Sequence, residues 1–124
     1  MNAINIPDIP FSFKEVWPTG SRYICDPPPT DTDNDTIVLV EDGVAFDSIL
    51  MTNGWEFGGS FFEGDQWYSY KKLVNGVIEN LIITEKHDLF ARWKLATEVS
   101  KKLNLVDKRD RIIVFQLIVD GVEH

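Results

Sequence analysis

An Asn-Gly pair at positions 75 and 76 is the feature that most limits the folds open to this chain. On either side stand segments rich in β-branched, aromatic and aliphatic residues, WYSYKKLV at 67–74 and VIENLIIT at 77–84. Asn-Gly between two such segments favours a two-residue turn, and a turn of that length determines the strand register. The sequence therefore predicts an antiparallel hairpin. The register pairs Val74 with Val77, Lys72 with the oppositely charged Glu79, and Lys71 with Asn80.

Shorter elements are predicted before the hairpin. The apolar, partly β-branched run over 35–40 predicts a strand buried on both faces, closed by a turn at Asp42-Gly43. Apolar residues on one helical face predict a short helix over 46–52. Trp55 to Phe57 predicts another strand, followed by a flexible turn at Gly58-Gly59-Ser60. A lid over a site and a strand bulge are two further interpretations of these glycines.

Helical spacing returns after the hairpin. Apolar residues three and four apart predict a helix from about Asp88 to Leu103. Asp107 is placed to cap a second helix, which Gly121 would close. At the other end of the chain, prolines leave room only for a short helical piece over 12–17.

These elements predict an α+β fold in which a small mixed β-sheet packs on one layer of helices, with two helices at the C-terminus. The length of 124 residues indicates a single domain over 1–124. A net charge of -8 argues against a general DNA-coating role. The single cysteine, the lack of a signal-peptide pattern and the short apolar runs predict a cytoplasmic protein without a membrane span.

Three aspartates alternate with other residues just before the 35–40 strand, in the segment DTDNDTIVLV. Side chains two positions apart on a strand share a face, so Asp33 and Asp35 are placed to share a cation. Magnesium favours one or two carboxylates together with substrate phosphates. Asp31 and Asp33 have the same spacing; we favour Asp33 and Asp35 because the strand follows them directly. Upstream, Gly20-Ser21 offers close backbone approach and a hydroxyl for phosphate oxygens.

A Gly-Ser pair, a spacer, an Asp-x-Asp pair and an apolar strand together resemble the nucleotidyltransferase superfamily of the polymerase-beta type. The likeness covers nearly the whole chain from Gly20 onward. The segments WEFGGS at 55–60, NLIIT at 80–84, LATEVSKKLNL at 95–105 and DRIIVFQ at 110–116 look like the small single-domain members carried by bacteriophages.

The resemblance implies a nucleotidyltransferase fold and a metal-dependent enzyme that moves a nucleoside monophosphate from a triphosphate such as ATP to an acceptor. It implies that Asp33 and Asp35 hold two magnesium ions and that Gly20 and Ser21 bind the triphosphate. Arg22 would add a phosphate contact, or else pair with a surface carboxylate. The acceptor would be a protein or an RNA, and the host-cell cytoplasm would be the location of a phage-encoded member.

One position departs from the family pattern. The family has a third carboxylate on a neighbouring strand, as the base for the acceptor, and the matching residue here is Asn80. An amide does not take up a proton at neutral pH, and Glu79 would point to the other face of the sheet. A catalytically inactive interaction or inhibitor protein on the same fold is therefore the alternative hypothesis.

The aromatic residues and the assembly state leave further alternatives open. Trp55, Trp67, Tyr68 and Tyr70 either stack on a base or pack in the core and across strands. Lys71 and Lys72 either reach a phosphate or belong to a charged strand face. A small domain with this many aromatic residues also suggests a homodimer.

Overall fold

The computed structural model describes residues 13–30, 32–61 and 67–119. A five-stranded mixed sheet with the strand order β1-β2-β5-β4-β3 forms its centre. The parallel pair β2 and β5 is central, and all other neighbours are antiparallel. The strands are β1 (Glu15–Thr19), β2 (Asn34–Leu39), β3 (Glu56–Phe61), β4 (Trp67–Val74) and β5 (Val77–Thr84).

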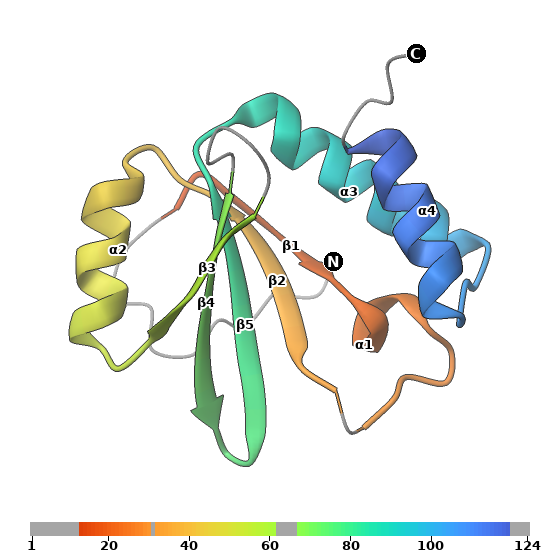
Figure 1. The fold of residues 1–124 in the computed structure, drawn as a ribbon, viewed down its shortest axis with the longest axis horizontal. Helices are drawn as coiled ribbons and strands as arrows, with labels where there is room; N and C mark the ends of the chain where they lie inside the picture. Colours follow the sequence, from red (N-terminus) through yellow and green to blue (C-terminus); the bar gives the residue numbers. More distant parts are fainter. Residues whose placement is uncertain (1–12, 31, 62–66, 120–124) are drawn as a thin grey trace.

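Helices lie on both faces of this sheet (Figure 1). The helices α1 (Ser21–Ile24), α3 (His87–Lys102) and α4 (Lys108–Ile118) gather on one side, and α2 (Gly43–Thr52) lies on the other. The α+β class and the mixed sheet are confirmed, but the expected single layer of helices is wrong. Because the central strands are apolar on both faces, each face needs a cover.

Two hydrophobic clusters show how alternate residues of β2 serve the two faces. Ile37 and Leu39 pack with Ile82 of β5 against α3 residues such as Phe90 and Trp93. Val38 packs on the opposite face with Phe46 and Leu50 of α2. Residues 37 to 40 are all at most 2% exposed, which confirms the predicted doubly buried strand.

The predicted hairpin is confirmed residue by residue. Strands β4 and β5 have the predicted bounds, and Val74 lies opposite Val77. Asn75 and Gly76 both have positive φ, as a two-residue turn of this kind requires. Lys72 and Glu79 are cross-strand neighbours. Their side chains also contact other groups: Lys72 Nζ donates to Asn53 O, and Glu79 accepts from Asn34.

The helical piece expected over 12–17 is wrong, because this segment contributes the edge strand β1. Pro18 lies in β1 opposite Thr36 of β2. Proline is tolerated there because an edge strand needs hydrogen bonds on only one side. This segment forms a strand because it pairs with β2, and that pairing outweighs the local preference for a helix.

The expected turns at 42–43 and 58–60 are wrong. Asp42 is the N-cap of α2, and its Oδ1 accepts hydrogen bonds from the N–H groups of Val44 and Ala45. The helix therefore begins at Gly43, earlier than predicted. Residues 58–60 belong to β3, which shifts register against β4 between Phe57 and Gly59. Of the interpretations given for these glycines, the structure confirms the strand bulge.

The two C-terminal helices are confirmed. The carboxylate of Asp107 accepts from Arg109 N at the start of α4, whereas Gly121, the expected end of this helix, lies outside the described residues. None of the helices in the described part of the chain has the length and apolar character needed to cross a membrane.

Candidate functional site

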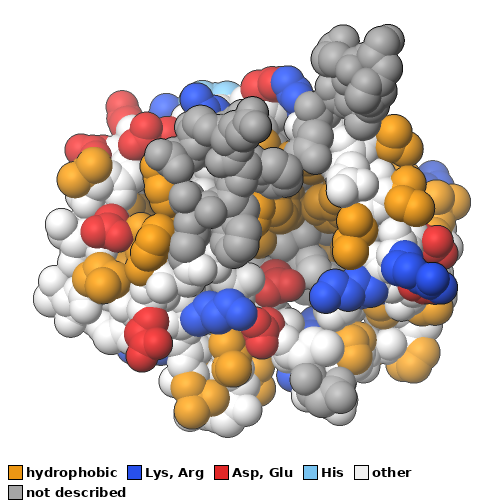
Figure 2. Space-filling view, in the orientation of Figure 1, with side chains coloured by type: hydrophobic (Ala, Val, Ile, Leu, Met, Phe, Trp, Pro, Cys, Tyr) orange, Lys and Arg blue, Asp and Glu red, His pale blue; other side chains and the backbone are white. Residues whose placement is uncertain are grey.

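The residues of the Gly-Ser and Asp-x-Asp motifs meet in one cavity of about 770 Å³, on the face of the sheet covered by α3 and α4. Figure 2 shows a hollow between the sheet and these helices, with acidic and basic side chains at its rim. The lining includes two carboxylates at the start of β2, the N-terminal end of α1 and two cations from α4: Asp33, Asp35, Gly20, Ser21, Lys108 and Arg111.

Strand alternation places both carboxylates toward this cavity. Asp35 shares the face of Ile37 and Leu39, and Asp33 lines the same cavity. Asp31, the alternative partner, lies outside the described residues. The geometry thus brings together the pair that the sequence favoured.

Gly20 lies directly against Asp35. Thr19, the last residue of β1, is the cross-strand partner of Asp35, and Gly20 then turns the chain into α1 with φ of 78°. A Cβ atom at Gly20 would lie 2.1 Å from Asp35 Oδ2. Only glycine fits between the carboxylate and the start of the helix.

We expect Gly20→Ala to destabilise the fold by about 2–4 kcal/mol, because alanine adds both a strained φ and a clash with a carboxylate. Gly76→Ala is a matched control: its φ is 81°, and a Cβ there would meet nothing within 4 Å. That variant should lose only about 1 kcal/mol. Urea unfolding of both variants measures the difference. Equal losses would contradict close packing of Gly20 on Asp35.

A buried hydrogen-bond network holds the end of β1 in place. Thr19 Oγ1 lies 2.7 Å from Thr97 Oγ1 and accepts from Trp93 Nε1 at 3.1 Å. Thr97 in turn donates to Trp93 O. Because these α3 residues are buried, the position of Gly20 is tied to the helix behind the sheet.

Asn80 lies beside Asp35, as its partner on the neighbouring strand β5. Its Nδ2 donates to Asp35 Oδ1 at 3.0 Å, and its Oδ1 accepts from Ser69 Oγ at 3.1 Å. Glu79 bonds to Asn34, the residue before Asp35, so it lies on the other face as expected. The neighbour of Asp35 on β5 is thus an amide that donates to its carboxylate.

Burial raises the pKa of Asp35 to about 6. The neighbouring charges of Asp33 and Glu79 also raise this pKa, whereas the hydrogen bond from Asn80 and the charge of Lys71 lower it. A positive charge close to two neighbouring carboxylates favours their ionised form. This pair of aspartates therefore favours a bound cation.

The ammonium group of Lys71 is a positive charge beside Asp33. Its Nζ lies 2.9 Å from Asp33 Oδ2, and both side chains are partly exposed, at 48% and 31%. An ion pair this exposed contributes little stability, so an incoming metal ion could displace the lysine at small cost. The sequence predicted either a phosphate contact or a charged strand face for Lys71, and the contact of Lys71 with Asp33 was not predicted.

We expect Lys71→Met to raise the affinity of the native protein for magnesium by about two- to tenfold, because it removes a competing positive charge. Lys72→Met is the control, since Lys72 points to the other face and donates to Asn53 O. Magnesium titration followed by NMR of the Asp33 and Asp35 signals measures both. A Lys71 variant with weaker magnesium binding would contradict the competition.

Ser21 and Arg22 connect α1 to the aspartate loop. Ser21 Oγ donates to Thr32 Oγ1 at 3.3 Å. Arg22 donates from Nε to Thr32 O and from Nη2 to Thr30 O, each at 2.7 Å. Ser21 lines the cavity, whereas Arg22 is not among the lining residues. The guanidinium group thus braces the loop that precedes Asp33.

Comparison of the chain with protein-family models, with curated proteins and with solved structures found no match.

The oxygen atoms that line the cavity are of the type that magnesium prefers. Asp33 and Asp35 supply carboxylate oxygens, which are hard ligands, and Asp35 Oδ2 lies close to the backbone of Gly20. Within the described ranges, no group of three or more His, Cys, Asp or Glu side chains gathers around one point. The pair would therefore share its ions with other oxygens, such as those of substrate phosphates and water.

The cations on α4 were not predicted from the sequence. Lys108 and Arg111 line the same cavity as the two carboxylates. Arg111 Nη1 donates to Leu105 O and Val106 O, both at 2.9 Å, which holds the start of α4 to the preceding loop. No local pattern marks these residues, because their position depends on how α4 packs across the sheet.

The aromatic residues divide between the two faces. Trp67 lines the cavity together with Trp93, and the two rings meet edge to face at 5.0 Å. Trp55 and Tyr70 are buried in the cluster under α2, with Tyr68 packed against it. Among the four aromatics considered for base stacking, Trp67 is the one that lies at this cavity.

Proposed function

We propose that this protein is a minimal metal-dependent nucleotidyltransferase of the polymerase-beta type, which moves a nucleoside monophosphate from a nucleoside triphosphate to an acceptor. The observation that supports this most is the meeting of Asp33, Asp35 and Gly20-Ser21 in one cavity, with Gly20 packed against Asp35. The proposed setting is the cytoplasm, or the host cytoplasm for a phage-encoded protein.

Each residue has a defined part in this proposal. Asp33 and Asp35 would hold two magnesium ions, whose binding would displace Lys71 from Asp33. Gly20 and Ser21 take the phosphate oxygens through backbone N–H groups and the hydroxyl. Lys108 and Arg111 line the same cavity, where they would offset the remaining charge of the triphosphate. The bound ions would supply charge neutralisation for the departing pyrophosphate.

The acceptor oxygen forms a bond to the α-phosphorus while the bond to pyrophosphate breaks. Asn80 cannot take up the proton of the acceptor hydroxyl, so this proton would pass to solvent water. We therefore propose an acceptor whose hydroxyl loses its proton without a strong base. A protein or an RNA is the class of acceptor that we propose, met at the open rim of the cavity by one subunit or by a homodimer.

The amide at position 80 also supports a second candidate, a protein on the same fold that does not catalyse transfer. Asn80 donates to Asp35 where an enzyme would have a base. Such a protein would act through its acidic surface, as an interaction partner or inhibitor that imitates nucleic acid.

Thermal unfolding with ATP, GTP, CTP and UTP, each with and without magnesium, tests the proposal. A magnesium-dependent rise in melting temperature with at least one triphosphate is expected. Release of pyrophosphate in the presence of cell extract would then separate transfer from binding alone. If no triphosphate shifts the melting temperature, the metal-nucleotide site is wrong and the non-catalytic candidate is favoured.

A further inference from the structure

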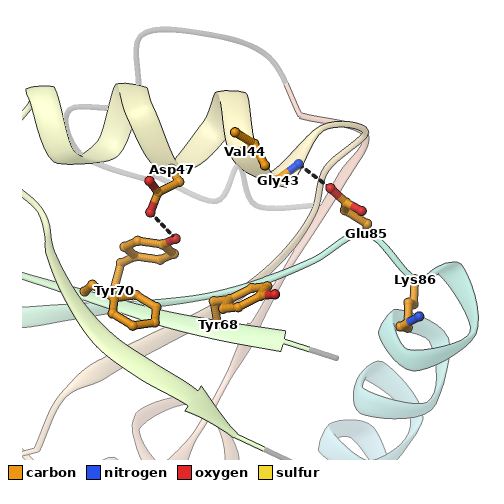
Figure 3. Close-up of a pocket in the computed structure, with 8 residues that line it drawn as sticks. Gly43, Val44, Asp47, Tyr68, Tyr70, Glu85 and Lys86 are labelled. Carbon is orange, nitrogen blue, oxygen red and sulfur yellow. Dashed lines mark hydrogen bonds between the residues drawn. The ribbon is translucent and has the colours of Figure 1, made fainter. Parts of the chain in front are cut away.

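A second cavity, of about 510 Å³, lies on the opposite face of the sheet and plays no part in the proposed transfer. It is bounded by α2, by the strands β3 and β4, and by the segment that leads into α3 (Figure 3). Three aromatic rings form its apolar wall: Phe57 from β3, and Tyr68 and Tyr70 from β4.

The three rings are inclined to one another and form a corner. The ring centroids of Phe57 and Tyr70 are 5.5 Å apart with planes at 59°, and those of Phe57 and Tyr68 are 6.2 Å apart with planes at 43°. Phe57 is 50% exposed although it is a large apolar side chain, so its ring is open to a ligand. Inclined ring faces offer negative π density to a cation from more than one side.

Two carboxylates add negative charge to this pocket. Asp47 of α2 points toward the rings and accepts a hydrogen bond from Tyr70 Oη at 2.5 Å (Figure 3). Glu85 accepts from Gly43 N at the N-terminal end of α2. Neither carboxylate forms an ion pair with any residue in the described part of the chain. Burial and the bond to Asp47 raise the pKa of Tyr70, so its hydroxyl stays protonated and holds Asp47 in place.

Lys86 is the cation among the lining residues. Figure 3 shows it at the opposite end of the pocket from Asp47 and Tyr70, at the start of α3. Two carboxylates and one ammonium group leave the pocket with net negative charge. The aromatic end near Asp47 is therefore where a positive group would bind.

We propose that the pocket formed by Phe57, Tyr68, Tyr70 and Asp47 binds an organic cation of the N-methylated ammonium class. An unmodified ammonium group donates three hydrogen bonds and needs an oxygen acceptor for each, whereas the wall of this pocket beside Asp47 consists of the rings of Phe57, Tyr68 and Tyr70. A trimethylammonium group donates no hydrogen bond, and it combines an apolar surface for the rings with a charge for the carboxylates.

Titration of the full-length protein with choline, followed by NMR of the aromatic side chains, tests this proposal. Its neutral isostere, in which a tert-butyl group replaces the trimethylammonium group, is the matched ligand. We expect saturable shifts of Phe57, Tyr68 and Tyr70 with choline, and binding of the isostere that is at least about tenfold weaker. Equal binding of the two ligands, or no saturable shift with choline, would overturn the proposal.

Two variants test which groups bind the cation. Phe57→Leu removes a half-exposed ring, and Asp47→Asn removes charge while keeping an acceptor for Tyr70. Each should weaken choline binding by about fivefold or more. Leu73→Ala, at a 69% exposed position outside the pocket, is the control and should bind choline normally. Asp33→Ala should also bind choline normally, since the pocket is independent of the proposed metal site. Normal choline binding by both pocket variants would overturn the assignment of the site.

Discussion

Alanine at Asp33 or at Asp35 is expected to abolish the magnesium-dependent rise in melting temperature that a nucleoside triphosphate gives the native protein. The two carboxylates are the acidic groups that line the cavity with Gly20 and Ser21, so either loss leaves the magnesium ions with a single protein ligand. At a hundredfold excess of nucleotide over its dissociation constant, the native shift should be about 10 °C. Thermal unfolding with magnesium and each triphosphate measures it.

The fold should survive both substitutions. Asp33 loses a partly exposed ion pair with Lys71, which costs less than about 1 kcal/mol, and the repulsion between the two carboxylates disappears. Glu41→Ala is the control, because Glu41 is an exposed carboxylate just beyond the other end of β2. An aspartate variant that keeps the shift, or a Glu41 variant that loses it, would contradict the proposed site. Loss of folding in Asp33→Ala would also count against it.

Asparagine at Asp35 is expected to stabilise the protein above pH 6, by up to about 3 kcal/mol, and to have little effect near pH 4. Burial raises the pKa of Asp35 from 3.8 to about 6 in the folded state. The folded protein thus binds the proton more tightly than the unfolded chain does. The stability of the native protein should therefore be highest below pH 4 with respect to this group, and fall as the pH rises toward 6 and the carboxylate ionises.

Asn is nearly isosteric with Asp and can still accept the hydrogen bond from Asn80, so the substitution removes the charge with little change of shape. Urea unfolding of the native protein and of Asp35→Asn between pH 4 and pH 8 measures the difference. Glu41→Gln controls for the loss of one negative charge from an acidic protein. If the difference in stability between the native protein and Asp35→Asn does not grow between pH 4 and pH 7, burial does not raise the pKa of Asp35. Magnesium, which binds the ionised form, should stabilise the native protein most above pH 6.

The hairpin shows which parts of the fold could be predicted from the sequence. The Asn75-Gly76 turn and the strand alternation are local properties, so the register and the opposed positions of Lys71 and Asn80 followed directly. The same alternation placed Asp33 and Asp35 on one face and Glu79 on the other. These predictions needed only the period of a strand and the geometry of a two-residue turn.

Predictions failed where a distant segment decides the structure. Residues 15–19 form an edge strand because β2 pairs with them, although the prolines of the opening segment had left room only for a short helical piece. Gly58 and Gly59 lie in β3 because β4 supplies the hydrogen bonds. Strands β2 and β5 have apolar side chains on both faces of the sheet, and α2 covers those on the second face. The need for this cover arises only once the sheet is assembled.

The sequence by itself determined the hairpin, the C-terminal helices and the shared face of the two aspartates, because each depends on neighbours a few positions away. Only the tertiary structure placed Lys71 on Asp33, Lys108 and Arg111 in the same cavity as the carboxylates, and Phe57 beside Tyr68 and Tyr70. Those contacts join elements far apart in the chain. Their geometry is determined by how helices and strands pack, which no local pattern records.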